Sequence, residues 1–265
     1  MSGFDAKWLR LREPVDGLAR DVALVDAFSR YVADRAPPAT VLDIGCGTGS
    51  TYRSLSQHLP AGTNWRLLDY DPSLLAAAEK QLGTKGIEFV RHDLNQPDGM
   101  PLDGVSIVTA SAFFDLGSAA FCDRLLDVLA ARRIGLYAAL NYDGRVEWQR
   151  PHPLDQRVVA DFNHHQLTDK GLGPALGPNA TEHLRTKLDA LSYDVSIAPS
   201  VWRIGRDEAD LHIAFLRGLV DPVLEIGALQ PEEIGEWMAF RLAYVRGERG
   251  GCEVGHHDLL ALPRD

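Results

Sequence analysis

VLDIGCGTGS, residues 41–50, is the stretch of sequence that decides the fold. Its aliphatic start contains one acid, Asp43, and is followed by three alternating glycines at 45, 47 and 49 and then by a helix-like segment. This pattern predicts a buried strand, a tight turn and the N-terminus of a helix. Because glycine lets a ligand approach the backbone closely, we expect a nucleoside-bearing ligand at this turn.

The spacing of the glycines distinguishes this turn from two other glycine-rich turns, the dinucleotide-binding fingerprint and the P-loop. It is G-x-G-x-G, whereas the dinucleotide-binding fingerprint is G-x-G-x-x-G, which disfavours a nicotinamide-dependent reductase. No Gly-Lys-Ser or Gly-Lys-Thr follows, so the turn is not a phosphate-binding P-loop. The remaining alternative for the glycines alone is an ordinary strand-to-helix turn.

A second apolar strand, predicted over 65–68, ends at Asp69. In a βαβ nucleotide site, an acid at the end of the second strand accepts hydrogen bonds from the ribose hydroxyls. A carboxylate suits this role because it only accepts and can hold both hydroxyls. Asp69 is therefore the predicted ribose ligand, whereas Asp71 is predicted to cap a helix that begins at Pro72.

Two more predicted strands end in a similar way. Residues 87–92 lead to Asp93, and residues 104–110 lead to Ser111, which an aromatic pair and Asp115 follow. Four such strand ends in this order closely resemble the motifs of class I S-adenosylmethionine-dependent methyltransferases. The resemblance covers residues 38–143 well and the remainder only weakly.

This resemblance implies a fold, a cofactor and a set of cofactor contacts. The fold is a Rossmann-like sheet of seven mostly parallel strands with helices on both faces and an antiparallel last strand. The cofactor, S-adenosyl-L-methionine, is expected over the carboxyl ends of the strands, at the topological switch point. Asp93 would receive the adenine amino group, Leu94 would meet the ring and Ser111 would lie against the methionine part. The predicted cofactor-binding residues are Asp43, Gly45, Gly47, Gly49, Asp69, Tyr70, Asp93, Leu94 and Ser111.

Two observations argue against a nucleic-acid substrate. Methyltransferases that act on exocyclic base nitrogens carry two prolines after the fourth strand, whereas residues 111–114 read Ser-Ala-Phe-Phe. The chain also has 27 Lys and Arg against 37 Asp and Glu, a net charge of −10, where nucleic-acid enzymes usually show a basic patch. The same charge disfavours anionic membranes. We therefore expect a small-molecule acceptor, methylated on oxygen or nitrogen in preference to carbon.

The predicted catalytic residues are those that can move a proton from the acceptor. His164 and His165 suit a general base because imidazole titrates near neutral pH, although both fit a solvated helix face equally well. Asp115 either faces the reaction centre or caps a helix over 117–131, and Tyr142 is a further candidate. Asp161 and His165 have helical spacing, but two ligands do not make a metal site, so no metal is predicted.

Substrate recognition is predicted to come from outside the common core. The expected parts of one domain, 1–265, are a helical cover (1–36), the cofactor-binding core (37–145), a substrate-side insertion (146–178) and the C-terminal half of the sheet with a helical insertion (179–265). Long functional loops tend to be lids or binding elements, which favours the insertion. The predicted substrate-binding residues are Arg12, Phe114, Asn141 and Asp169.

Composition sets the remaining expectations. With 265 residues, 45% hydrophobic and 24% charged, the chain can form one large α/β domain. No apolar run reaches the ~18 residues of a membrane span, and no signal-peptide core is visible. Three widely spaced cysteines fit reduced thiols of a cytoplasmic protein. An apolar stripe over 231–247 is core or a dimer surface, so a homodimer is one expectation.

Two other functions remain open at this point. One keeps the cofactor but transfers a different group or cyclises the cofactor itself. The other is a non-catalytic protein that binds the cofactor. Formation of S-adenosylhomocysteine on turnover separates methyl transfer from both.

Overall fold

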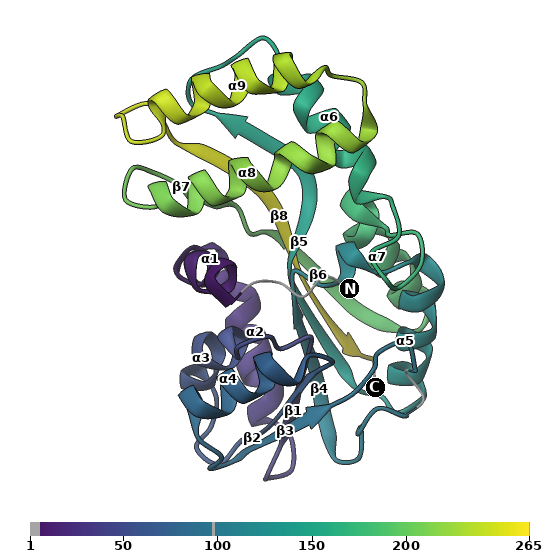
Figure 1. Ribbon diagram of the computed structural model, residues 1–265. Helices are drawn as coiled ribbons and strands as arrows, with labels where there is room; N and C mark the ends of the chain where they lie inside the picture. Colours follow the sequence, from purple (N-terminus) through teal and green to yellow (C-terminus); the bar gives the residue numbers. More distant parts are fainter. Residues whose placement is uncertain (1–5, 97–98, 265) are drawn as a thin grey trace.

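The computed structural model describes residues 6–96 and 99–264. Within them, eight strands form one sheet in the order β3-β2-β1-β4-β5-β8-β6, with β7 also paired to β8 (Figure 1). β1 to β5 are parallel, and β8 runs antiparallel to its neighbours. The predicted Rossmann-like sheet with an antiparallel last strand is confirmed. The strands are β1 (Thr40–Ile44), β2 (Asn64–Asp69), β3 (Ile87–Arg91), β4 (Val105–Ser111), β5 (Gly135–Trp148), β6 (Tyr193–Pro199), β7 (Trp202–Ile204) and β8 (Cys252–Pro263).

The strand order places the topological switch point between β1 and β4. β1 is followed in the sheet by β2 and β3 on one side and by β4 and β5 on the other. Chain crossovers therefore leave in opposite directions, and a crevice forms at the carboxyl ends of these two strands.

The sheet differs from the expectation in two respects. It has eight strands among the described residues instead of seven, because the segment 193–204 forms two strands that pair with different parts of β8. In the sequence, the apolar run over 134–140 and the turn residues Asp143-Gly144 predict a fifth strand that ends near Leu140. Instead β5 continues to Trp148, since irregularities after Ala138 and after Tyr142 absorb the unpaired residues while β8 accompanies it.

Helices cover both faces of the sheet, and α5 and α7 share one of them (Figure 1). None of the helices in the described ranges is long and apolar enough to cross a membrane. Short 3-10 helices lie at Ser56–His58, Phe114–Leu116 and Gly177–Asn179. The α-helices are α1 (Ala6–Ala19), α2 (Val22–Ala33), α3 (Ser50–Leu55), α4 (Pro72–Leu82), α5 (Ala119–Ala131), α6 (Asp155–Gln166), α7 (Ala180–Ala190), α8 (Ala209–Ile226) and α9 (Pro231–Tyr244).

Two hydrophobic cores flank the sheet, one on each face. Val41 and Leu67 join the core that includes α2, whereas Leu42 and Leu68 join the core of α5 and α7. Successive strand residues point to opposite faces, so both faces of β1 and β2 are buried and their sequences read as near-continuous apolar runs. This double burial fixes the register that brings Asp43 and Asp69 to the same edge of the sheet.

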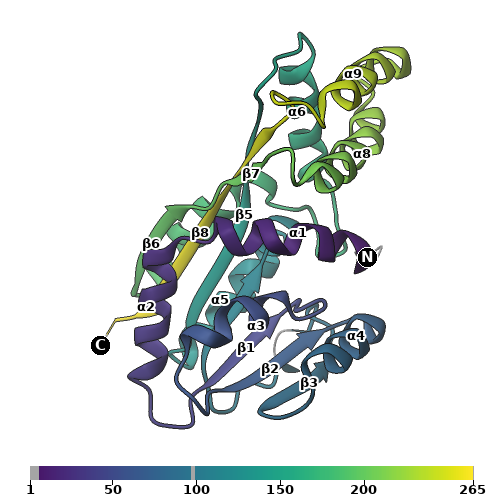
Figure 2. The ribbon, with the colours of Figure 1, turned by 90° about the vertical axis from the view of Figure 1, so that its left-hand side faces the viewer.

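The long ends of β5 and β8 extend beyond the common sheet and carry α6, α8 and α9 (Figures 1 and 2). Aromatic rings and one arginine fill the centre of this extension. The Arg241 guanidinium carbon lies 4.4 Å from the ring centroid of Trp148 and 5.7 Å from that of Trp237. Asp155 accepts hydrogen bonds from Arg241 and, at 2.9 Å, from Trp237 Nε1.

The Arg241–Asp155 pair gives a prediction for stability. Asp155→Ala will lower the free energy of unfolding by about 3–5 kcal/mol, because it leaves a buried guanidinium without its anion. Asp210→Ala is the matched control: its pair with Arg246 is exposed on both sides, so we expect about 0–1 kcal/mol. Urea unfolding of both variants measures the difference, and equal losses would contradict this role of Asp155.

Candidate active site

The glycine turn after β1 depends on backbone geometry that other residues rarely adopt. Gly45, Gly47 and Gly49 have φ values of 62°, 55° and 83°. A Cβ on Gly45 would lie 2.9 Å from Phe113 Cδ2, and one on Gly47 would lie 3.2 Å from Leu9 Cδ1. The turn therefore presents bare backbone to the crevice at the switch point.

Asp69, at the end of β2, is fixed by two backbone amides. Gly47 N donates to its Oδ2 at 2.8 Å, and Asp71 N donates to its Oδ1 at 2.9 Å. The two bonds lock the carboxylate beside the glycine turn and leave each oxygen free to accept another hydrogen bond. Asp71 caps α4, with Pro72 in its first turn, as predicted.

A cavity of about 750 Å³, which we call the glycine-turn cavity, lies against this turn. Six of the nine residues predicted to bind the cofactor line it: Gly45, Gly47, Asp69, Tyr70, Leu94 and Ser111. Its other walls include Phe113 and the segment 169–172. The four strand ends thus converge on one space, as their order in the sequence predicts.

The other three predicted cofactor residues do not line the glycine-turn cavity. Asp43 is buried below the turn, where Thr109 Oγ1 donates to it at 2.8 Å and burial raises its pKa to about 7. Gly49 packs tightly: a Cβ there would lie 2.7 Å from Leu82 Cδ1. Asp93 accepts two hydrogen bonds from Asn95 at 3.0 Å, which form a turn that leads Leu94 into the cavity.

A buried arginine lies behind Ser111. Arg20 Nη2 donates to Ser111 Oγ at 3.2 Å, while Nε and Nη1 are buried without a partner among the described residues. Burial opposes the charge, but Tyr137, Asp258 and Asp16 outweigh it and raise the pKa of the guanidinium. Arg20 is therefore a permanent cation with unused donors next to the glycine-turn cavity.

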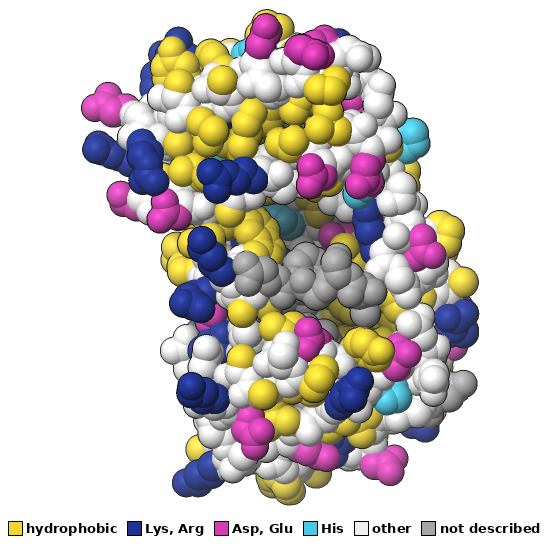
Figure 3. All heavy atoms as spheres, viewed as in Figure 1, with side chains coloured by type: hydrophobic (Ala, Val, Ile, Leu, Met, Phe, Trp, Pro, Cys, Tyr) yellow, Lys and Arg dark blue, Asp and Glu magenta, His cyan; other side chains and the backbone are white. Residues whose placement is uncertain are grey.

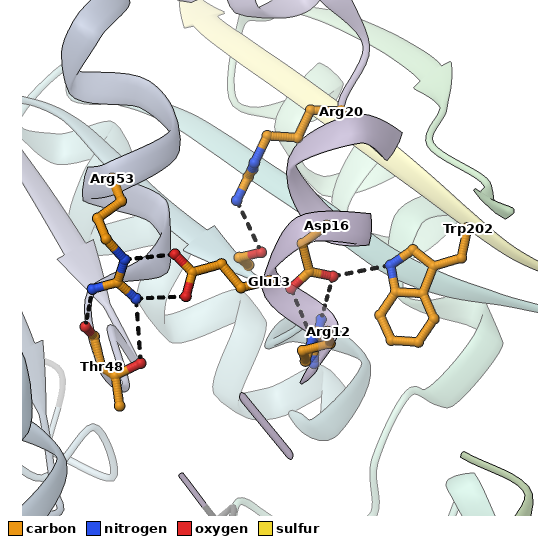
Figure 4. A network of polar contacts seen from close by, with 8 residues as sticks. Arg12, Glu13, Asp16, Arg20, Thr48, Arg53 and Trp202 are labelled. Atoms are coloured by element: carbon orange, nitrogen blue, oxygen red, sulfur yellow. Dashed lines mark hydrogen bonds and ion pairs between the residues drawn. The ribbon is translucent and has the colours of Figure 1, made fainter. Parts of the chain in front are cut away.

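Helix α1 crosses over the crevice and is fastened on both sides (Figures 2 and 4). On one side, Arg53 of α3 binds Glu13 at 2.5 and 2.7 Å and Thr48 O at 2.6 Å. On the other side, Trp202 Nε1 of β7 donates to Asp16 at 2.9 Å. α1 thus joins the glycine turn to the extension.

A second cavity, of about 610 Å³, lies between α1, α6, α8 and β7, where this face of the molecule is hollowed (Figure 3). We call it the aromatic cavity, because five rings besides histidine line it: Trp8, Tyr142, Phe162, Trp202 and Phe215. It adjoins the glycine-turn cavity at five residues that line both, which we call the junction: Trp8, Arg12, Ala112, Leu116 and Lys170.

Asp115 lines the aromatic cavity beside the junction. Its Oδ1 is buried without a hydrogen-bond partner among the described residues. Burial raises its pKa to about 6, against the opposing effects of a backbone N–H and Arg12. The alternative of a helix cap is wrong, because Ser118 caps α5 by accepting from Phe121 N at 3.2 Å.

The two predicted histidines have different positions. His164 is exposed and lines neither cavity, whereas His165 lines the aromatic cavity. His165 Nδ1 lies 3.0 Å from Lys170 Nζ and its Nε2 lies 2.9 Å from Glu225 Oε2. Since an ammonium only donates, Nδ1 accepts and Nε2 carries the hydrogen, so both nitrogens are engaged. No group of three or more potential metal ligands occurs in the described part of the chain.

Tyr142 and His256 line the aromatic cavity side by side, with ring centroids 6.0 Å apart. Tyr142 donates to Asn163 Oδ1 at 2.8 Å, and burial raises its pKa above the usual range. His256 Nδ1 lies 3.1 Å from Val254 O, and burial lowers its pKa to about 3. His256 is therefore neutral, with the hydrogen on Nδ1.

The four predicted substrate residues are separated by the structure. Arg12 lines both cavities, and Asp169 lines the glycine-turn cavity, where it accepts from Gly171 N at 2.7 Å. Phe114 and Asn141 are fully buried and line neither cavity. Asn141 donates to Ala138 O and His257 O within the sheet.

Several lining residues were missed from the sequence, namely Trp8, Lys170, Trp202, Phe215 and His256. Trp8 and Lys170 lie in segments that were expected to cover the site. Nothing in the sequence singles out these two residues within their segments. Trp202 and Phe215 belong to the extension of the sheet, and the sequence of this extension contains no recognisable motif. From the sequence alone, His256 is interpreted as a structural residue, because its neighbours at the cavity come from distant parts of the chain.

Comparison with known proteins agrees with this geometry. Residues 41–131, from β1 to the end of α5, match a family model described as a methyltransferase domain. The chain therefore contains a methyltransferase domain. No curated protein matches the sequence.

Three solved structures are similar to this chain at low sequence identity. The YcgJ protein from Bacillus subtilis is 13% identical, with a TM-score of 0.50 over 92% of this chain and 100% of that one. A methyltransferase from Geobacter sulfurreducens, in complex with S-adenosylhomocysteine, is 16% identical, with a TM-score of 0.46 over 93% and 92%. One from Thiobacillus denitrificans, also in complex with S-adenosylhomocysteine, is 14% identical, with a TM-score of 0.48 over 98% and 99%.

The residues of this methyltransferase fit its cofactor. A nucleoside needs a close approach to the backbone and an acceptor for its diol, which the glycine turn and the Asp69 carboxylate provide. An amino acid end needs polar partners and a nearby cation for its carboxylate; the cavity lining offers Ser111, and the buried Arg20 lies directly behind it.

Proposed function

We propose that this methyltransferase transfers a methyl group to a small molecule bound in the aromatic cavity. One observation supports the proposal most directly: the glycine-turn cavity and the aromatic cavity adjoin at the junction. A methyl donor in the first and an acceptor in the second would meet there. The volume of about 610 Å³ falls in the range of small-molecule sites. The net charge of −10 disfavours nucleic acid.

In this proposal the predicted cofactor residues divide between the two ends of the ligand. Asp69 accepts from the ribose hydroxyls, and Tyr70 and Leu94 contact the adenine. Ser111 contacts the methionine end, and Arg20, which lines neither cavity, holds Ser111 from behind. Asp43, Gly49 and Asp93 act by shaping the turn and the strand end, since they lie outside the cavity lining.

Bound S-adenosylmethionine supplies a methyl group that is already activated by its sulfonium. The protein therefore has to orient the acceptor and exclude water, and the aromatic walls and the roof of α1 suit both tasks. Trp8 and Trp202, whose ring centroids are 6.2 Å apart, hold a flat or apolar acceptor on the α1 side.

The acceptor oxygen or nitrogen must lose a proton during or before transfer, and Asp115 is the best placed group to take it. It lines the aromatic cavity with an oxygen that has no protein partner. Tyr142 and His165 lie near it on the cavity wall, but their polar atoms are engaged with Asn163, Lys170 and Glu225. They are positioning residues in this scheme, and His164 has no part in it.

The scheme also covers the whole chain as one cytoplasmic domain. The core 37–145 holds the cofactor, and the acceptor site is built from the cover 1–36, the insertion 146–178 and the extension within 179–265. A homodimer through the exposed side of α9 remains part of the proposal, since Leu242 and Tyr244 are partly exposed there.

Binding and product analysis test this function. Calorimetry should show one site for S-adenosylmethionine and for S-adenosylhomocysteine. Incubation with S-adenosylmethionine and a panel of aromatic hydroxyl and amine compounds should release S-adenosylhomocysteine and a product heavier by one methylene. Cofactor binding followed by a different cofactor product would favour the alternative of another group transfer or cyclisation. Binding without turnover of any kind would favour a non-catalytic protein.

A further inference from the structure

The charged residues at the junction are both cations. Of the five residues that line both cavities, only Arg12 and Lys170 carry a charge. They come from opposite sides of the site, since Arg12 belongs to α1 and Lys170 to the loop after α6. A group that bridges the two cavities therefore passes between an ammonium and a guanidinium.

Lys170 is held in place by a chain of hydrogen bonds that ends at the surface. Its Nζ donates to His165 Nδ1 and His165 O at 3.0 Å and to Thr168 Oγ1 at 2.9 Å. His165 Nε2 in turn donates to Glu225, whose side chain is 68% exposed. Burial lowers the pKa of Lys170, and Glu225 opposes this effect. The three bonds account for the three hydrogens of the ammonium and support its charged form.

Three acids lie near these cations: Asp16 pairs with Arg12, Asp115 lines the aromatic cavity and Asp169 lines the glycine-turn cavity. Arg12 binds Asp16 of the same helix through Nε at 2.8 Å and Nη2 at 3.2 Å, and its guanidinium carbon lies 5.1 Å from the centroid of the Trp202 ring. Glu225 reaches Lys170 only through His165. At low dielectric, the two cations would stabilise a negative charge at the junction and oppose a positive one.

We propose that the acceptor is an aromatic hydroxyl compound, whose oxygen becomes anionic at the junction and is stabilised there by Lys170 and Arg12. The rings that line the aromatic cavity suit the aromatic part, and the junction suits a phenolate better than an alkylammonium. This inference rests on the proposed function and narrows its acceptor from oxygen or nitrogen to a phenolic oxygen.

The proposed methyl transfer needs no group besides the hydroxyl compound, Asp115 and S-adenosylmethionine. Asp115 takes the proton of the hydroxyl, and the oxygen forms a bond to the methyl carbon. The bond from that carbon to sulfur breaks, and its electron pair goes to sulfur, which becomes neutral. The methyl ether and S-adenosylhomocysteine are the products, and Asp115 returns its proton to water.

The test compares two probes with the same ring system, 2-naphthol and 2-naphthylmethylamine, the second of which is a cation at neutral pH. Calorimetry on protein saturated with S-adenosylhomocysteine should show that 2-naphthol binds at least tenfold more tightly. Lys170→Met should weaken the binding of 2-naphthol about tenfold while it changes the Kd of S-adenosylhomocysteine less than threefold. Lys80→Met, which removes the same charge from the exposed side of α4, should change neither.

Several results would overturn the inference. These are the absence of 2-naphthol binding, equal or tighter binding of the amine, and unchanged 2-naphthol binding in Lys170→Met. If Lys170→Met weakens S-adenosylhomocysteine as much as 2-naphthol, the lysine serves the cofactor, and the inference also fails. In each of these cases S-adenosylhomocysteine still binds the wild-type protein, so the proposed function stands; failure of the wild type to bind it would instead reject that function.

Discussion

Asp69→Ala is expected to weaken the binding of S-adenosylmethionine by about a hundredfold or more. Hydrogen bonds to a charged group contribute about 1.5–3 kcal/mol each, and the proposed contact with the ribose uses two. The loss of two such bonds corresponds to at least ~3 kcal/mol, or about two powers of ten in Kd. The substitution also frees the amides of Gly47 and Asp71, which Asp69 now fixes at 2.8 and 2.9 Å, so the turn itself loosens.

Calorimetry on two further variants makes this result specific. Asp69→Asn keeps one acceptor oxygen but removes the charge, so its affinity should fall between those of the wild type and Asp69→Ala. Asp103→Ala removes an exposed acid between β3 and β4 and should leave the affinity unchanged. Thermal unfolding without cofactor checks that each variant is folded. Wild-type affinity in Asp69→Ala would reject the ribose assignment.

Asp115→Asn is expected to lower kcat for a hydroxyl acceptor by about 10²–10⁴-fold, the usual contribution of a general base. The amide keeps the size of the side chain but cannot take a proton at neutral pH. Affinity for S-adenosylhomocysteine should stay within about threefold, since Asp115 lines only the aromatic cavity. Asp123→Asn, on the outer side of α5, is the matched control and should keep full activity.

The pH dependence gives a second measure of the same residue. Asp115 must be ionised to accept a proton, and burial raises its pKa to about 6. In the wild type, kcat should therefore rise as the pH rises through about 6 and then level off. The nearby charged and titratable groups are those of the same cavity, together with Cys122 of α5. Burial raises the pKa of Cys122 and of Tyr142 well above this range and lowers that of His256 to about 3. The other groups of the cavity are Arg12, His165 and Lys170. If kcat of Asp115→Asn rises with the same midpoint, the rise belongs to the titration of another group.

The sequence predicts much of the lining of the glycine-turn cavity because its signals are local. The spacing of Gly45 and Gly47 indicates the turn, and Asp69 is recognised as the acid that ends an apolar run. Parallel strands buried on both faces then bring their carboxyl ends to one edge, so no contact between distant segments has to be guessed. All three residues line the glycine-turn cavity.

The aromatic cavity could not be predicted in the same way, because its walls come from segments far apart in the chain. The hydrogen bond from Trp202 to Asp16 spans 186 residues. No periodicity or motif in α1, β7 or α8 shows that they meet, since each also reads as an ordinary core element. The segment 146–178, where substrate recognition was expected, supplies only one wall of the aromatic cavity, through Phe162, His165 and Lys170.

Backbone geometry explains the burial of Phe114 and Asn141, both predicted from their positions at strand ends. Ala112 and Leu140, close before them, have φ values of 50° and 55°. Asp258 holds Leu140 in this conformation by accepting from its amide at 2.8 Å. Non-glycine residues seldom adopt such angles, so the turn of these two side chains away from the cavities leaves no sign in the sequence.

The double fastening of α1 has a consequence for the timing of the catalytic cycle. The helix is attached to Arg53 on the side of the glycine turn and to Trp202 in the wall of the aromatic cavity, and its Trp8 and Arg12 line both cavities. In the proposed reaction, spent cofactor and methylated product would both lie against this helix. We expect that a single swing of this helix admits and discharges both ligands, so that the escape of one is tied to the escape of the other.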